Sequence, residues 1–299
     1  MSRIAHVQSI DGVPIGYRTT GTGPPLVLVH GASADSTVMA LLIPLLQQHY
    51  TVHAVDRRGR GQSGDAPTYD ITLEYADIAA VVDERAQASG RSVAVYGHSY
   101  GAVCALGAAL RTRNIDRLFL YEPGFGAVLS PRREVLDRVD ELATAGRDDA
   151  ALEHFYREAV GMTADDIAAM RHQPSWQARL ASVPTIPREL RTAAALEFDP
   201  TPYRDFAVPT TLLLGDRSTP GQKSVVAAIH ATLPHSTIVS LPGQAHAAQI
   251  TAPHLVADAL RSAGGLRATS RVGGSGETGR SITRAAHPGS DHALSRPRR

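Results

Sequence analysis

The chain has very little cysteine and lysine, and it lacks long apolar runs. Its single cysteine, Cys104, cannot form an internal disulfide, and it excludes a zinc site built from several cysteines. Lys223 is the one lysine beside many arginines, and this bias points to no mechanism. No apolar stretch approaches the roughly 20 residues that a membrane-spanning helix needs, and residues 1–6 lack the apolar run of a signal peptide. We therefore expect a cytoplasmic protein without a membrane span.

Charge is distributed unevenly along the 299 residues, although 30 basic and 29 acidic side chains almost cancel. Residues 266–299 carry seven arginines and two acids, a net charge of +5, so residues 1–265 carry −4. A mildly acidic body argues against a nucleic-acid-binding protein, whose folded domain presents a basic face. The basic segment is also poor in leucine, isoleucine and valine, so we expect residues 266–299 to form a disordered tail.

Strand-like and helix-like segments alternate over most of the acidic body. A hairpin is expected over residues 4–20, and the continuous apolar run that follows at 25–31 suits a buried parallel strand. Further strands are expected at 51–55, 92–96, 117–121, 210–214 and 237–241, and helices at 37–48, 72–89, 100–111, 222–233 and 253–263. Strands that alternate with helices predict an α/β fold with a mostly parallel sheet.

The alternation stops at Pro123, and up to Val208 the sequence shows helical periodicity without a convincing strand. Helices are expected there at 133–144, 148–160, 164–172, 175–180 and 187–196. Such an insertion is most economically placed over the C-terminal edge of the strands, where open α/β sheets bind ligands. We therefore divide the chain into a core of residues 1–122 and 209–265, a helical cap of residues 123–208, and the tail of residues 266–299.

The strongest chemical signal is the segment Gly97-His98-Ser99-Tyr100-Gly101, which has the pattern G-x-S-x-G. An apolar strand precedes it and a helix of small residues follows, which is the setting that a nucleophile elbow requires. In such a turn the serine takes a strained backbone conformation, and the glycines let neighbouring backbone approach closely. The sequence therefore predicts Ser99 as a nucleophile, with a plain glycine-rich turn as the alternative.

A serine hydroxyl is a weak nucleophile and needs a base, which in turn needs an orienting carboxylate. His246 is the candidate base among 13 histidines, because it lies in the loop between the last expected strand and the final helix. His98, inside the elbow, is expected to point away from Ser99. Glu122 and Asp216 each follow a strand that ends at the same edge of the sheet, so either could orient His246.

The oxyanion of acyl-transfer chemistry needs two preorganised N–H donors. The N–H of Tyr100, directly after the nucleophile, is the first candidate. The second is the N–H of Ala32, in the loop after the first buried strand. The sequence contains no cluster of metal ligands and no glycine loop suited to a phosphate, so we expect neither a metal nor an organic cofactor.

Four segments resemble the α/β-hydrolase superfamily in its order and spacing, over about residues 5–263. They are Val29-His30-Gly31-Ala32, the segment 56–64, the elbow at 97–101 and Pro242-Gly243-Gln244-Ala245-His246. The resemblance implies the α/β-hydrolase fold: an eight-stranded, mostly parallel sheet with an antiparallel second strand, helices on both faces and a helical cap inserted after strand 6. The family's usual acid position is Ser218 in this chain.

Some members of that superfamily place the acid at the end of strand 6 instead, where this chain has Glu122. We therefore favour Glu122 over Asp216. The resemblance covers esterases, carbon–carbon bond hydrolases and cofactor-free haloperoxidases, and it disfavours epoxide and haloalkane hydrolysis, which need a carboxylate where Ser99 stands.

The predicted function is a serine hydrolase that cleaves an ester, thioester or related acyl bond of a small, apolar molecule through an acyl-enzyme on Ser99. Phe125 and Trp176 in the cap could line its pocket, although such residues more often form the cap's own core. The same triad could serve carbon–carbon bond hydrolysis, acyl transfer or cofactor-free perhydrolysis, and the fold could belong to a ligand-binding protein with an idle triad. Substrate identity and oligomeric state are left open by the sequence.

Overall fold

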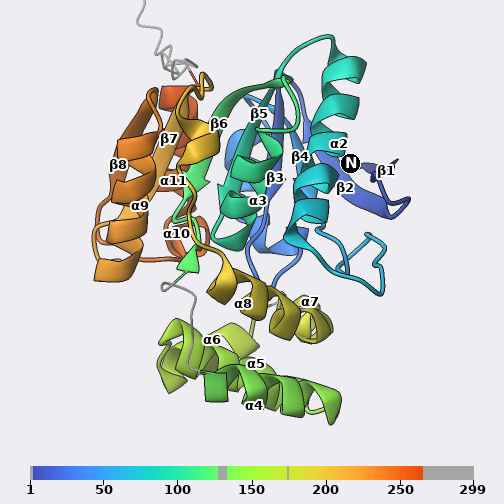
Figure 1. Cartoon of the computed structure of the whole chain (residues 1–299), viewed down its shortest axis with the longest axis vertical. Coiled ribbons are helices and arrows are strands. Elements are labelled where there is room, and N and C mark those ends of the chain that lie inside the picture. Colours follow the sequence, from blue (N-terminus) through green and yellow to red (C-terminus); the bar gives the residue numbers. More distant parts are fainter. Residues whose placement is uncertain (1–2, 127–132, 174, 265–299) are drawn as a thin grey trace, which may run out of the picture. The chain divides into compact units, whose positions relative to one another are not determined.

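A twisted eight-stranded sheet is the centre of the computed structural model, which describes residues 3–126, 133–173 and 175–264 (Figure 1). In chain order the strands are β1 (Arg3–Gln8), β2 (Pro14–Gly21), β3 (Pro25–Val29), β4 (Thr51–Val55), β5 (Val93–His98), β6 (Ile115–Tyr121), β7 (Thr210–Gly215) and β8 (Ser236–Leu241). Across the sheet their order is β1-β2-β4-β3-β5-β6-β7-β8. Only β2 runs antiparallel to its neighbours, so the predicted sheet is confirmed.

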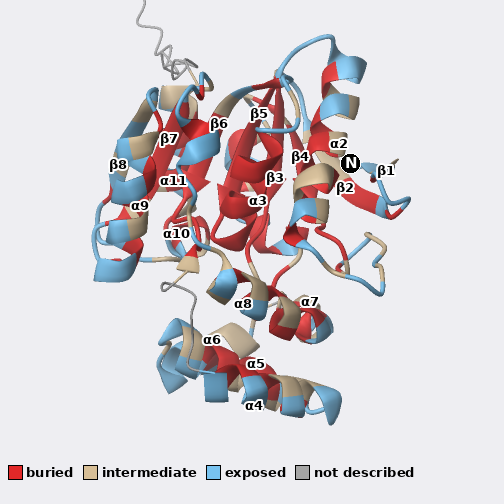
Figure 2. Ribbon diagram, viewed as in Figure 1, coloured by how far each residue is buried: buried red, intermediate tan, exposed pale blue. Residues whose placement is uncertain are grey.

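Helices cover both faces of the sheet, as successive side chains of β3 show. Val27 and Val29 belong to the same apolar cluster as α2, α3 and α9, whereas Leu26 and Leu28 pack with α1 and α11 on the opposite face. These helices are α1 (Ile43–Leu46), α2 (Ile71–Ser89), α3 (Tyr100–Ala108), α9 (Pro220–Thr232) and α11 (Pro253–Ala263). The central strands and the inner helix faces are buried, and the outer helix faces are exposed (Figure 2).

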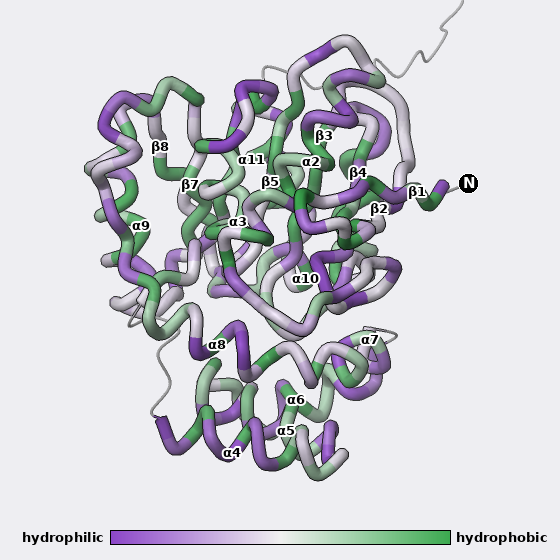
Figure 3. The backbone as a smooth tube through the Cα atoms, turned by 45° about the vertical axis from the view of Figure 1, so that its right-hand side comes forward, coloured by the Kyte–Doolittle hydropathy of each residue, from purple (hydrophilic) through white to green (hydrophobic). Residues whose placement is uncertain are grey.

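A group of helices separates β6 from β7, and we call it the inserted helices. It comprises α4 (Arg133–Thr144), α5 (Asp148–His154), the π-helical turn η3 (Phe155–Val160), α6 (Ala164–Arg171), α7 (Trp176–Ala181), the 3₁₀ turn η4 (Val183–Thr185) and α8 (Ile186–Ala195). The inserted helices have an apolar core of their own, and they lie beyond the end of the sheet at which β6 ends (Figure 1). Hydrophobic and hydrophilic residues alternate along them, whereas β3 is continuously hydrophobic (Figure 3).

The structure departs from the predicted elements in a few places. The helix predicted at 37–48 is split into the 3₁₀ turn η1 (Ser36–Met39) and α1, because Pro44 lies in the first turn of α1 and starts a new helix. The short helix α10 (Ala248–Thr251) and the 3₁₀ turn η5 (Thr201–Tyr203) were not predicted. Residues 266–299, predicted as a disordered tail, lie outside the described residues. Within the described part, no helix is long and apolar enough to cross a membrane.

Candidate active site

Ser99 lies in a sharp turn between β5 and α3, at the edge of the sheet where the parallel strands end. Its backbone angles are φ 55° and ψ −120°, a combination that a residue with a side chain rarely adopts. Gly101 is needed here because a Cβ atom at that position would collide with the carbonyl oxygen of His30. This is the strained strand–turn–helix geometry that the G-x-S-x-G pattern predicts.

His246 and Glu122 form a hydrogen-bonded pair at the same edge. The Nδ1 atom of His246, in the loop after β8, lies 2.7 Å from Oε2 of Glu122, which directly follows β6. Glu122 is buried and itself has a positive φ of 45°, so its backbone is strained like that of Ser99. Asp216 is exposed, and its carboxylate makes no hydrogen bond or ion pair within the described residues. The structure therefore brings Glu122, and not Asp216, to His246.

The second carboxylate oxygen of Glu122 is held equally firmly. Its Oε1 atom accepts hydrogen bonds from the N–H of Gly215, at 2.8 Å, and from the hydroxyl of Ser218. Ser218 occupies the position at which the resemblance places the usual acid. In this chain the residue at that position thus orients the carboxylate that comes from β6.

The loop that carries His246 is anchored by groups that the sequence did not single out. The Nε2–H of His98 donates to the His246 carbonyl at 2.7 Å, and the two imidazole rings lie 4.7 Å apart. Tyr121 donates to the carbonyl of Ala245 and accepts from the N–H of Ala248. The sequence predicted only that the His98 side chain points away from Ser99, and it gave no sign that this ring packs against that of His246. No local pattern could have shown this, since 148 residues separate the two histidines.

The peptide between Gly31 and Ala32 is oriented by two donors. The Gly31 carbonyl accepts hydrogen bonds from Nδ1 of His30, at 2.8 Å, and from Nη1 of Arg57, at 3.1 Å. Because a trans peptide is planar, the N–H of Ala32 points opposite to this carbonyl. Gly31 lies next to the nucleophile, since a Cβ atom on it would be 3.1 Å from Cβ of Ser99.

Within the described residues, the N–H groups of Ala32 and Tyr100 donate to no backbone or side-chain acceptor. For Tyr100 this follows from its place as the first residue of α3, where an N–H has no partner within the helix. Both predicted donors therefore lie close to Ser99 with their hydrogens available.

The protonation state of His30 is fixed by its surroundings. The backbone N–H of Arg57 donates to Nε2 of His30 at 3.1 Å, so Nε2 must be unprotonated. Burial, and then the nearby charges of Arg57 and Arg60, lower the pKa of His30 well below its ordinary value. His30 is thus neutral and carries its proton on Nδ1, where it donates to Gly31.

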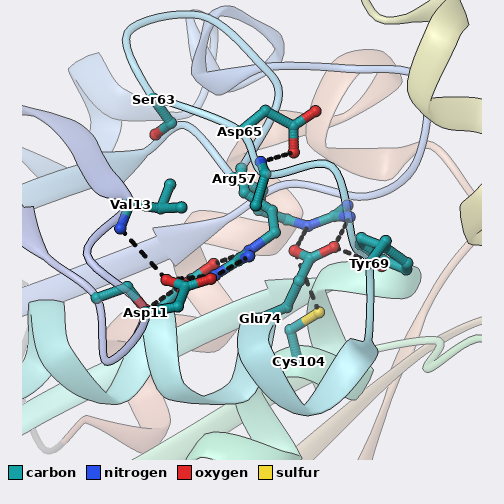
Figure 4. A network of polar contacts seen from close by, with 12 residues as sticks. Asp11, Val13, Arg57, Ser63, Asp65, Tyr69, Glu74 and Cys104 are labelled. Atoms are coloured by element: carbon teal, nitrogen blue, oxygen red, sulfur yellow. Dashed lines mark hydrogen bonds and ion pairs between the residues drawn. The ribbon is translucent and has the colours of Figure 1, made fainter.

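Arg57 is itself held by a buried network of charges (Figure 4). Its guanidinium contacts both carboxylate oxygens of Glu74, at 2.6 and 2.8 Å, and also pairs with Glu189 of α8. Tyr69 donates to Glu74 as well, at 2.6 Å. Burial alone would raise the pKa of Glu74, but the charge and hydrogen bonds of Arg57 outweigh it and lower the pKa to about 2. Glu74 is therefore ionised and keeps Arg57 beside the Gly31 carbonyl.

The two aromatic residues predicted to bind substrate are placed in apolar cores. Phe125 packs edge-to-face against Phe198, with ring centroids 5.4 Å apart. Trp176 is buried in the core of the inserted helices, 6.5 Å from the ring of Tyr156. Within the described residues, neither side chain makes a ring contact with His246. Phe125 thus packs with the sheet and its helices, whereas Trp176 lies in the core of the inserted helices, where the alternative interpretation placed it.

A cavity of about 300 Å³ lies between the loop after β4 and helix α7. Its lining consists of Asp35, Gly59, Arg60, Gly61, Ser63, Ala178, Ala181 and Ser182. Neither Ser99 nor His246 lines it, so this cavity is separate from the reacting groups. Within the described residues, no group of three or more histidine, cysteine or acidic side chains is arranged to hold a metal ion.

Comparison with known proteins agrees with this geometry. The sequence pattern of the alpha/beta hydrolase family matches residues 26–259. The chain is 26% identical over 263 residues to 2-(acetamidomethylene)succinate hydrolase of Mesorhizobium japonicum, an alignment that covers 84% of this chain and 91% of that enzyme.

Solved structures are similar over almost the whole described chain. A crystal structure of an alpha/beta hydrolase from Sphaerobacter thermophilus DSM 20745 is 32% identical and superposes with a TM-score of 0.76, covering 87% of this chain and 99% of that chain. The esterase RhEst1 from Rhodococcus sp. ECU1013 superposes with a TM-score of 0.69 at 23% identity, covering 88% of this chain and 99% of that chain.

Proposed function

Because the chain belongs to the alpha/beta hydrolase family and is therefore a hydrolytic enzyme, we propose that it cleaves a carboxylic ester, thioester or related acyl bond of a small molecule through an acyl-enzyme on Ser99. One observation carries this proposal: the strained Ser99 lies at the sheet edge that also holds the His246–Glu122 pair. A nucleophile, a base and an orienting carboxylate at one site are the parts that acyl transfer requires.

In the proposed reaction the Ser99 hydroxyl attacks the acyl carbon while Nε2 of His246 takes its proton. The N–H groups of Ala32 and Tyr100 stabilise the oxyanion that develops on the former carbonyl oxygen. His246 then returns the proton to the leaving group, and a water molecule, activated in the same way, releases the acid from Ser99. No step in this sequence draws on a metal or an organic cofactor.

Glu122 has the role of the orienting acid in this proposal. Its hydrogen bond fixes the His246 tautomer with the proton on Nδ1, so that Nε2 is free to act as the base. The negative charge also stabilises the imidazolium that forms after proton transfer. Gly215 and Ser218 keep the carboxylate from rotating, because they occupy its other oxygen.

Residues 123–208 are proposed to act as a cap on the core of residues 1–122 and 209–265. Two contacts support this division: Glu189 of α8 pairs with Arg57, and Arg179 of α7 donates to the carbonyl of Ser33. Both reach the loops that surround Ser99. The Mesorhizobium relative acts, by its name, on an acetamido compound, so the acyl bond proposed for this chain includes an amide.

The test uses p-nitrophenyl butyrate and a fluorophosphonate probe. The proposal expects ester hydrolysis by the native chain, covalent labelling that mass spectrometry maps to Ser99, and loss of both in Ser99→Ala. A Ser99→Ala variant that still turns over the ester would contradict the mechanism. Product analysis of this ester separates hydrolysis from acyl transfer and perhydrolysis, which would use the same triad. A chain that is neither labelled nor active would overturn the role proposed for Ser99.

A further inference from the structure

Arg179 of α7 extends from the inserted helices into the loop that follows β3. Its side chain is buried, with only 6% of the residue exposed. The Nη1 group donates to the carbonyl of Ser33 at 3.2 Å and to the hydroxyl of Tyr156 at 2.7 Å. Tyr156 in turn lies 3.0 Å from the Ser33 hydroxyl. Within the described residues, the hydrogen-bond partners of this guanidinium are therefore all neutral oxygens.

The other buried arginines of the described chain each have an acidic partner. Arg57 pairs with Glu74 and Glu189, Arg58 with Asp77 and Asp11, and Arg60 with Glu189. Within the described residues, no carboxylate lies at ion-pair distance from Arg179. A buried charge without a counter-charge is costly, because neutral oxygens replace only part of the lost hydration. A ligand with a negative charge at this position would supply the missing counter-charge.

The position of Arg179 connects this charge to the proposed chemistry. Its acceptor Ser33 directly follows Ala32, the proposed oxyanion donor, and shares the backbone strain of the site with a φ of 50°. Burial, and then the charges of His246 and Arg179, lower the pKa of His98 well below its ordinary value. Arg179 is thus close enough to act electrostatically on the residue that packs against His246.

The unused donors of Arg179 have the right arrangement for an anion. Within the described residues, Nε and Nη2 make no hydrogen bond, and together they form the side-on edge that binds a carboxylate through two parallel hydrogen bonds.

We propose that Arg179 binds a carboxylate group of the substrate, so that the chain acts on acyl compounds that carry a second, free acid group. This inference rests on the proposed function, because it names the substrate class of the same site. It replaces the apolar molecule expected from the sequence with an anionic one of similar size. A monoester or monoamide of a short dicarboxylic acid fits, with the acyl carbon at Ser99 and the free carboxylate at Arg179.

The first test measures binding without turnover. In a Ser99→Ala background, calorimetry compares mono-p-nitrophenyl glutarate with p-nitrophenyl pentanoate, which has the same leaving group and no second acid. A charge-assisted pair predicts that the anionic ester binds about ten- to one-hundred-fold more tightly. Adding Arg179→Met should abolish this preference, whereas Arg138→Met, which removes an exposed arginine paired with Glu141 on α4, should leave it intact.

A Ser99→Ala protein with no preference for the anionic ester would overturn the inference, as would a preference that survives Arg179→Met. Arg179→Lys keeps the positive charge but loses the two parallel N–H donors. We expect it to retain part of the preference that Arg179→Met abolishes. Circular dichroism confirms that each variant is folded.

The second test measures turnover of the same two esters by the chain with Ser99 intact. If both are hydrolysed at equal rates and Arg179→Met lowers both alike, Arg179 is only structural and the proposed function stands. If neither ester is hydrolysed and Ser99 resists the fluorophosphonate, the proposed function fails, while the binding preference still decides the role of Arg179. A kcat/KM for the glutarate ester that falls at least tenfold in Arg179→Met, with little change for the pentanoate ester, supports the inference.

Discussion

Glu122 and His246 lie 124 residues apart in the chain, yet Oε2 of one and Nδ1 of the other are 2.7 Å apart. Three donors surround the carboxylate: the imidazole, the Gly215 N–H and the Ser218 hydroxyl. An acid fixed in this way can orient a histidine without itself taking up the proton. Substitutions of Glu122 and Asp216 can therefore test which carboxylate orients His246.

We expect Glu122→Gln to lower kcat by about 10⁴-fold, because an uncharged amide cannot stabilise the imidazolium and favours the wrong tautomer of His246. Asp216→Asn is the matched control, since it removes an exposed carboxylate from the neighbouring loop and should change kcat less than twofold. Steady-state hydrolysis of p-nitrophenyl butyrate measures both. A larger loss in Asp216→Asn than in Glu122→Gln would show that the acid is assigned wrongly.

His30 is expected to affect the rate although it touches no reacting atom. His30→Leu removes a donor to the Gly31 carbonyl and so loosens the peptide that presents the Ala32 N–H. Because an oxyanion donor acts mainly in the transition state, kcat should fall about ten- to one-hundred-fold while KM changes less than threefold.

The control for this variant is His53→Leu, which replaces another buried histidine, on β4, hydrogen-bonded to Thr19. It should leave kcat unchanged. A His30→Leu protein with a raised KM and a normal kcat would show that His30 serves substrate binding rather than the oxyanion.

Arg57→Met is expected to destabilise the protein by about 3–5 kcal/mol, because it leaves Glu74 and Glu189 buried without their main counter-charge. Glu74→Gln in the Arg57→Met background should recover part of that loss, since it removes one of the unpaired charges. Urea unfolding of the two single variants and the double variant gives the coupling energy. If Arg57→Met costs less than about 1 kcal/mol, the network is hydrated rather than buried.

Acidification should lower the free energy of unfolding at pH values above those at which most carboxylates take up protons. Burial, and then the charge of Arg85, lower the pKa of His53 to about 4, from an unfolded value near 6.5. Between these two pH values the unfolded chain binds a proton that the folded chain does not, so stability rises with pH and falls as the solution is acidified. The loss is about 1.4 kcal/mol per pH unit at its steepest. His30 and His98, whose pKa values are also lowered, act in the same direction.

Urea unfolding between pH 4 and pH 7 checks this dependence. His53→Gln should unfold with a visibly shallower pH slope than the native chain in this window. Identical slopes for the two proteins would mean that His53 titrates normally in the folded state. A change to glutamine keeps a polar side chain beside Thr19, so the comparison isolates the proton.

Much of the architecture could be predicted because its signals are local. The strand Thr51–Val55 and the helix Arg133–Thr144 begin and end where the apolar periodicity does. The single helix predicted at 37–48 is wrong because of Pro44. The proline ring is compatible with the first turn of a helix, so a new helix begins there and the preceding one does not continue. The π-helical turn Phe155–Val160 has no sequence signal that separates it from the α-helix before it.

The candidate site also contains some residues that the sequence predicts and others that it does not. Ser99 and His246 follow from short motifs, but the sequence left Glu122 and Asp216 as alternatives because both come directly after neighbouring strands. The difference arises from side-chain direction, set by the strained backbone of Glu122 and by its hydrogen bond with Ser218. Arg179 gave no signal at all, because its contact with Ser33 spans 146 residues and neither residue is unusual in its own segment.

Glu189 affects whether the inserted helices can unfold separately from the sheet. It is fully buried on α8, and its two arginine partners belong to the loop after β4. Separating α8 from that loop would remove both counter-charges of Glu189, although Arg57 would keep its pairing with Glu74, and leaving a buried charge unpaired is costly. Partial opening is therefore disfavoured relative to complete unfolding. We expect the inserted helices and the sheet to melt in one cooperative calorimetric transition.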